Sequence, residues 1–200
     1  MSNTLRADLK LIADLIEPGS RVLDVGCDDG ALLDYLVTER QVDGRGLELG
    51  QAGVNSCVAK GLFVIQGDAD NDLTEYPDDS FDYVVLSKTL QAVHRPREVL
   101  LNLLRIGKRA VVTIPNFGQW RVRFSLFKTG RMPVTKSLNR TWYNTSNIHF
   151  CTILDLFDLI EAEGITVKEF VPHTKGGRRL NVSKTRANWV ADQGLFLLER

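Results

Sequence analysis

The fold of this chain is decided by nine consecutive residues, Val22-Leu23-Asp24-Val25-Gly26-Cys27-Asp28-Asp29-Gly30. The apolar residues in the first half of this stretch predict a buried parallel strand, and the apolar-periodic segment 31–37 that follows predicts a helix. A strand, a tight glycine-containing turn and a helix N-terminus place backbone N–H groups where an anionic ligand group can bind. The stretch therefore predicts the first βα unit of a sheet that holds a nucleoside-bearing cofactor.

A second signal is Glu48, which ends the next apolar run, Gly46-Leu47-Glu48. An acidic residue after the second strand of a nucleotide-binding sheet accepts hydrogen bonds from a ribose diol. A dinucleotide site also requires the pattern G-x-G-x-x-G, so that the backbone can approach a pyrophosphate. Here Asp28 stands where a second glycine is expected, and its carboxylate would repel pyrophosphate oxygens. The sequence therefore disfavours a dinucleotide.

The pattern D-x-G-x-x-x-G resembles the first motif of class I S-adenosylmethionine-dependent methyltransferases, which is usually D-x-G-x-G-x-G. S-adenosylmethionine carries an ammonium and a sulfonium and no phosphate, so acidic neighbours suit it. Asp28 departs from the motif, which has a glycine at this position. If the position requires φ > 0, an aspartate there costs more conformational energy than a glycine. The plainer alternative is a generic βα turn. The resemblance implies that S-adenosylmethionine or S-adenosylhomocysteine is held by Asp24, Gly26, Cys27, Asp28, Gly30, Glu48, Leu49, Asp68, Ala69 and Ser87.

Strands alternate with helices along the whole chain. Strands are predicted at about 21–25, 45–49, 62–66, 81–86, 109–114, 166–171 and 194–198, and helices at 5–16, 96–106 and 152–163 among others. This alternation predicts a single α/β domain over residues 1–200, Rossmann-like and doubly wound, with a mainly parallel seven-stranded sheet covered on both faces. Ligands of such sheets bind at the carboxyl ends of the strands.

Two candidates beyond the first motif each have an ordinary alternative. Asp68 follows the third strand, where a carboxylate can accept the adenine amino group, but the same residue could cap a helix. His94 lies in the loop after the fourth strand, in a stretch that looks like the methyltransferase loop before the next helix. It is the candidate general base or pocket wall, and an ordinary loop histidine is an equally good interpretation.

The net charge is zero, but the charges are unevenly distributed. Residues 1–82 carry 17 acidic and 6 basic residues, whereas residues 83–200 carry 8 acidic and 19 basic residues. The stretches 121–140 and 175–186 are basic and contain no acidic residue. They are interpreted as solvated loops or as a docking face for an acidic protein partner. Nucleic acid is the least favoured partner, because domains that bind nucleic acid are typically basic and the pI of this chain is near 6.8.

The remaining composition indicates a globular cytoplasmic protein. No run of about eighteen apolar residues is present, so no membrane span is predicted, and the N-terminus does not resemble a signal peptide. Cys27, Cys57 and Cys151 are widely spaced and odd in number, which is typical of reduced thiols. His149 precedes Cys151 by two residues, but no second pair matches it, so no metal site is predicted.

Five further stretches are distinctive: Gln66–Asp70 (QGDAD), Ser87–Gln91 (SKTLQ), Ile114–Arg121 (IPNFGQWR), Gly130–Lys136 (GRMPVTK) and Trp142–Thr152 (WYNTSNIHFCT). Their combination is similar to the MetW family of methionine biosynthesis proteins, and the likeness covers nearly the whole chain. That family has the class I methyltransferase fold and is associated with the homoserine O-acyltransferase MetX. The resemblance implies an accessory, activating subunit of that enzyme. The alternative is an active methyltransferase with a small-molecule acceptor.

Segment 115–150 is expected to cover the pocket mouth as a lid or substrate wall. It combines aromatic residues with the first basic stretch, a mixture that is enriched in protein interfaces, although plain packing is the default for most of the aromatics. Asn116, Trp120 and His149 are its candidate substrate or lid residues. The sequence has no clear triad or carboxylate pair, which argues against a hydrolase or acyltransferase active site in this chain.

Overall fold

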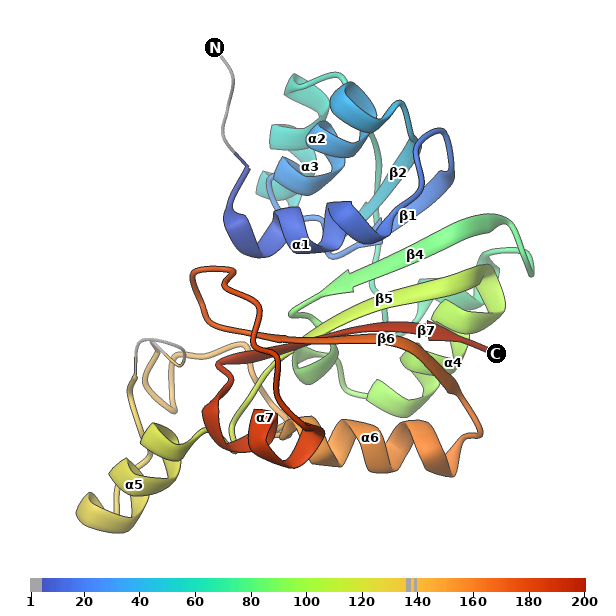
Figure 1. Ribbon diagram of the computed structural model, residues 1–200. Helices are drawn as coiled ribbons and strands as arrows, with labels where there is room; N and C mark the ends of the chain where they lie inside the picture. Colours follow the sequence, from blue (N-terminus) through green and yellow to red (C-terminus); the bar gives the residue numbers. More distant parts are fainter. Residues whose placement is uncertain (1–4, 136–137, 139) are drawn as a thin grey trace.

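The computed structural model of the chain describes residues 5–135, 138 and 140–200. Its centre is a seven-stranded sheet in the order β3-β2-β1-β4-β5-β7-β6, with helices on both faces (Figure 1). The strands are β1 (Arg21–Val25), β2 (Asp43–Glu48), β3 (Phe63–Gln66), β4 (Phe81–Ser87), β5 (Gly107–Pro115), β6 (Thr166–His173) and β7 (Gln193–Glu199). All seven predicted strands are confirmed, and their ends differ from the predicted ones by no more than two residues.

The helices are α1 (Ala7–Leu15), α2 (Ala31–Arg40), α3 (Gln51–Ala59), α4 (Pro96–Ile106), α5 (Trp120–Thr129), α6 (Ile153–Ala162) and α7 (Lys184–Val190), with the short 3-10 helices η1 (Asp72–Glu75) and η2 (Leu90–Ala92). Local signals fix where several of them begin. Pro96 opens α4 in the first turn, where its missing N–H costs nothing. Thr152 and Asp155 form a reciprocal capping box at the start of α6.

The sheet is mainly parallel, as predicted. Strands β3, β2, β1, β4 and β5 pair in parallel, and β7 runs antiparallel between β5 and β6. Chain order runs outward in opposite directions from β1 and β4, so the topological switch point lies between their carboxyl ends. In a doubly wound α/β sheet this is where ligands bind. The expected ligand site therefore lies between the turn after β1 and the loop after β4.

Alternating apolar residues of the strands build one hydrophobic core on each face of the sheet. On β4, Val84 and Leu86 point to the α4 and α6 side, while Tyr83 and Val85 point to the α1 and α2 side. Figure 1 shows α1, α2 and α3 on one face and α4, α6 and α7 on the other. Because both faces are covered, the central strands are mostly apolar, which makes them recognisable in the sequence.

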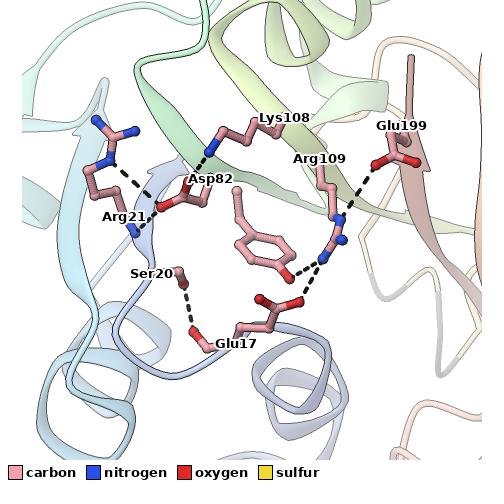
Figure 2. A network of polar contacts seen from close by, with 8 residues as sticks. Glu17, Ser20, Arg21, Asp82, Lys108, Arg109 and Glu199 are labelled. Atoms are coloured by element: carbon pink, nitrogen blue, oxygen red, sulfur yellow. Dashed lines mark hydrogen bonds and ion pairs between the residues drawn. The ribbon is translucent and has the colours of Figure 1, made fainter.

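A network of ion pairs lies at the amino ends of the central strands, opposite the switch point (Figure 2). Asp82 accepts hydrogen bonds from Lys108 and from the backbone N–H of Arg21, and the Lys108 contact lowers the pKa of its carboxyl group. Arg109 donates to Glu17 at 2.8 Å and contacts Glu199 at 3.7 Å. These pairs join β1, β4, β5 and β7 to the end of α1, so this edge has a structural role.

Candidate functional site

Three alternate residues of the turn after β1 have a positive φ. Gly26, Asp28 and Gly30 have φ of 71°, 51° and 74°. The position held by Asp28 therefore has the positive φ that favours glycine, and an aspartate tolerates it better than most residues. A Cβ on Gly26 would lie 2.8 Å from Oγ1 of Thr89, so this glycine lets the turn approach the loop after β4. The structure thus brings the two sides of the switch point together.

Glu48 connects the end of β2 to this turn. Its Oε2 accepts the backbone N–H of Asp28 at 2.9 Å, and its Oε1 accepts the N–H of Gly50 at 2.8 Å. The side chain is half-buried. Each carboxylate oxygen can accept more than one hydrogen bond, so the two backbone contacts orient the group and leave lone pairs for a diol. Leu49, the next residue, is 66% exposed and presents an apolar surface beside the carboxylate.

Asp24 is a buried carboxyl group inside β1, only 2% exposed. Burial raises its pKa to about 7, and the negative charge of Glu48 adds to the shift. A cation that binds beside such a carboxyl group favours its ionised form, and the two opposite charges then attract each other. Asp24 and Glu48 together make this edge of the sheet suited to a positively charged ligand.

The side chain of Cys27 points away from the ligand edge. It packs with Leu33, Cys57 and Leu62 under α2 and α3, and its sulfur lies 3.9 Å from the sulfur of Cys57. Burial raises the pKa of the Cys27 thiol. All three cysteines are free. Of the predicted cofactor-binding set, Cys27 can therefore contribute its backbone to a ligand while its side chain belongs to the core.

Asp68 stabilises the turn after β3. Its carboxylate accepts the backbone N–H of Asp70 at 2.9 Å and the side-chain amide of Asn71 at 2.8 Å. The helix that follows, η1, has Asn71 at its N-cap and no side-chain capping hydrogen bond, so Asp68 orders the turn and does not cap this helix. Ala69 is half-buried and packs against the core under α4.

Asp70 is a site residue that sequence reasoning missed. Its carboxylate accepts the backbone N–H groups of His94 and Arg95, both at 2.8 Å, which joins the turn after β3 to the loop before α4. His94 is exposed, and among the residues that the structure describes none is hydrogen-bonded to its ring to orient it as a base. The Asp-x-Asp spacing of QGDAD was the signal that could have identified Asp70.

The loop after β4 holds a second missed feature, an ion pair between Lys88 and Asp8 of α1. Lys88 has a φ of 57°, and Asp8 is only 8% exposed. Although burial opposes its ionisation, the hydrogen bond and charge of Lys88 hold the pKa of Asp8 below its usual value. Ser87 lies 3.3 Å from Thr113 on β5, oxygen to oxygen. The ion pair therefore fixes α1 over the loop beside the switch point.

The three predicted lid residues lie in different environments. Asn116 is 1% exposed and donates to the carbonyls of Asn188 and Ala191, so it joins the end of β5 to α7. His149 is half-buried, and its backbone N–H donates to the carbonyl of Gln91 in η2. Trp120 is 40% exposed at the start of α5. Residues 148 and 149 thus dock on the loop after β4, whereas α5 extends away from the sheet (Figure 1).

Two hollows lie away from this edge. One, of about 520 Å³, is at the amino ends of β1, β2 and β4 and is lined in part by Arg45, Phe63 and Tyr76. The other, of about 550 Å³, follows α5. Within the described ranges, no group of histidine, cysteine, aspartate and glutamate side chains is arranged to hold a metal ion. No described helix is long and apolar enough to cross a membrane.

Comparison with known families decides the relationship of this chain. The sequence model of the family described as "Methionine biosynthesis protein MetW" matches residues 6–198. The chain belongs to the MetW family. A relative from Rhodopirellula baltica, named bifunctional methionine biosynthesis protein MetXA/MetW, is 34% identical over 177 residues. That match covers 84% of this chain and 28% of the relative.

More distant relatives share the methyltransferase fold. Demethylmenaquinone methyltransferase from Renibacterium salmoninarum is 30% identical over 146 residues, which cover 68% of this chain and 60% of that protein. The matches thus span 28% of the first relative and 60% of the second, less than two thirds of either. The solved structure of an S-adenosylmethionine-dependent methyltransferase from Archaeoglobus fulgidus has a TM-score of 0.68 at 16% identity, covering 97% of this chain and 92% of the other. The fold is therefore that of the class I methyltransferases, as predicted.

Proposed function

We propose that this chain binds S-adenosylmethionine or S-adenosylhomocysteine at the carboxyl edge of its sheet and acts as an accessory subunit of homoserine O-acyltransferase. The observation that carries the proposal is the Rhodopirellula baltica relative, whose name joins MetXA and MetW in one polypeptide. Two proteins that are fused in one organism act at high effective concentration there, which is useful when they work as a complex. The proposal extends that association to this chain and places both in methionine biosynthesis.

The residues at the switch point fit the cofactor. Glu48 has lone pairs for the ribose hydroxyls, and Leu49 offers an apolar surface to a base. The turn from Gly26 to Gly30 and the buried Asp24 lie where the ammonium-bearing end would bind, so the carboxyl group of Asp24 would ionise opposite that charge. When bound, S-adenosylmethionine supplies an electrophilic methyl group. Methyl transfer requires mainly alignment of the acceptor with the methyl group, so it needs few dedicated catalytic side chains.

Two features support the accessory role. Asp28 replaces the glycine of the usual motif and occupies a left-handed conformation, which costs an aspartate more than a glycine. The proposed base, His94, is exposed, and Lys88 is engaged with Asp8. The residues around the switch point are therefore arranged for binding more clearly than for acid–base chemistry.

Methyl transfer to a small molecule is the second candidate, and one observation favours it. Oε1 of Gln91 and Nε2 of His149 are buried without a hydrogen-bond partner in the part of the chain that the structure describes. Buried polar atoms are nearly always paired, and a hydroxyl or amino group of an acceptor would pair them. The segments that carry the two residues are joined through the carbonyl of Gln91, so both atoms lie near the loop after β4.

The experiment that tests the accessory role measures acyltransferase activity. Purified homoserine O-acyltransferase is assayed alone, with this chain, and with this chain plus S-adenosylmethionine or S-adenosylhomocysteine. We expect the chain to raise the activity and the cofactor to change the size of that effect. Equal activity with and without the chain, at concentrations where the two proteins bind, contradicts the accessory role. A Glu48→Ala variant that activates fully but ignores the cofactor would assign the cofactor a regulatory role.

A further inference from the structure

Helix α5 projects from the rest of the domain, and most of its apolar side chains are exposed. Phe127 is 89% exposed, Phe124 58% and Trp120 40%. These residues are spaced at i, i+4 and i+7, so they form one stripe along the helix. Val122 is the only buried residue of α5 and faces the rest of the chain. Figure 1 shows α5 projecting beyond the sheet at one end of the molecule.

The segment after α5 continues the apolar surface. Trp142 and Tyr143 are 71% and 73% exposed, and their rings pack edge to face with centroids 5.6 Å apart. They line the hollow of about 550 Å³ together with Arg131, Met132, Val134 and Thr141. We call α5 and this hollow the α5 surface. Isolated exposed apolar residues are normal, but a contiguous stripe beside a hollow marks a recognition site.

The charges on the α5 surface have one sign. No acidic residue occurs between positions 99 and 154, and Arg121, Lys128 and Arg131 are all exposed. The guanidinium of Arg121 lies over the ring of Trp120 at 5.1 Å, and that of Arg123 lies over Trp189 of α7 at 5.2 Å. Arginine, tryptophan and tyrosine are the residues that dominate protein-interface energies. A complementary partner presents an apolar groove with acidic residues around it.

We propose that the α5 surface is the docking site for the acyltransferase, with the stripe of Trp120, Phe124 and Phe127 seated in a groove of that enzyme. The proposal rests on the proposed function, because it takes the partner from there. A helix that presents anchors at i, i+4 and i+7 is the standard arrangement for helix-in-groove recognition. A second copy of the chain is disfavoured, since two identical cationic surfaces repel each other. A bilayer is disfavoured because the hollow accepts an inserted side chain, which a flat membrane surface does not provide.

The test compares two variants that change exposed phenylalanines. In the first, Phe124→Asp and Phe127→Asp are combined on α5. In the control, Phe63→Asp alters the edge strand β3, where Phe63 is 74% exposed at the opposite end of the sheet order. Both proteins are first checked for native circular dichroism and an unchanged melting temperature. Binding of each full chain to purified homoserine O-acyltransferase is then measured by calorimetry.

We expect the α5 variant to weaken binding by about tenfold or more, because buried aromatic anchors dominate interface energies, and the control to bind like the unmodified chain. We also expect backbone amide hydrogen exchange at residues 120–129 to be slower in the complex than in the free chain. If the unmodified chain binds and the α5 variant binds equally well, this inference is overturned while the proposed function stands. If the unmodified chain does not bind at micromolar concentration, both fail.

Two further measurements identify a different occupant. Binding of the unmodified chain, but not of the α5 variant, to vesicles of phosphatidylcholine and phosphatidylglycerol in the absence of acyltransferase would assign the surface to a membrane. Concentration-dependent dimerisation that the α5 variant abolishes would assign it to a second copy. Either result overturns the inference.

Discussion

Glu48 accepts the backbone N–H of Asp28 with Oε2 at 2.9 Å, so the carboxylate at the end of β2 holds the turn after β1 in its left-handed conformation. The second oxygen of Glu48 is fixed in the same way by Gly50. Because the two contacts hold both oxygens of the carboxylate, its orientation is set before any ligand arrives. Preorganisation of this kind reduces the entropy lost on binding.

Glu48→Ala is therefore expected to weaken binding of S-adenosylmethionine roughly tenfold or more. The variant loses charge-assisted hydrogen bonds to the ribose, each contributing about 1.5–3 kcal/mol. Isothermal calorimetry measures the affinity. Glu39→Ala, an exposed glutamate on α2, is the matched control and leaves binding unchanged. No binding of the unmodified chain at millimolar ligand would refute cofactor binding altogether.

Asp28→Gly is expected to tighten binding of the same ligand. Glycine adopts the φ of 51° without steric cost, and the change removes a carboxylate that would face the carboxylate of the ligand. Asp79→Gly is the matched control, because Asp79 has a φ of 52° in an exposed loop at the far edge of the sheet. It should relieve comparable strain and leave the affinity as it was. Weaker binding by Asp28→Gly would mean that Asp28 pairs with the ligand's ammonium instead.

Asp24 makes both stability and binding depend on pH. Its folded-state pKa of about 7 lies above the ordinary value of 3.8, so the protonated form is favoured by folding. The stabilising contribution of this group is complete below pH 4 and is lost as pH rises through 7. Asp24→Asn, which carries no charge, should be more stable than the unmodified chain at pH 8, by up to about 4 kcal/mol, and similar to it at low pH.

The affinity for a cationic ligand should increase with pH, whereas the stability contributed by Asp24 decreases with pH. Ionised Asp24 attracts the ammonium, so affinity of the unmodified chain rises as pH increases through 7, and Asp24→Asn removes this dependence. Urea denaturation and calorimetry at a series of pH values measure the two effects. Identical pH profiles for both proteins would show that Asp24 does not titrate in this range.

Asn116 is predicted to matter for stability and not for ligand binding. Its side chain makes hydrogen bonds with Asn188, Ala191 and Gly118, all buried in the junction between β5 and α7. Asn116→Ala leaves these backbone groups without partners and should lower the free energy of unfolding by about 3 kcal/mol. Asn144→Ala, an exposed asparagine in the segment after α5, is the control. Cofactor affinity that falls while stability is unchanged would restore Asn116 as a ligand-binding residue.

Local sequence signals predicted most of the fold, including the turn after β1 that carries the candidate site. The apolar run of β1 and the glycines after it are consecutive in the chain, and their geometry follows from short-range sterics. Glu48 was found for a similar reason, because it ends a strand whose neighbour was already placed. The motif has a glycine at position 28, which suggests a positive φ there, and Asp28 has a φ of 51° in the structure.

The sequence by itself determined the class of fold, the order of its elements and which residues stand at the carboxyl edge of the sheet, since periodicity and turn chemistry are properties of neighbouring residues. Only the tertiary structure decided what lies beside what: that Lys88 pairs with Asp8, that Asp70 holds the loop of His94, and that Cys27 turns into the core. It also decided that Asn116 is buried while the aromatics of α5 are exposed. Burial depends on which distant segments pack against a residue, and no pattern within one segment carries that information.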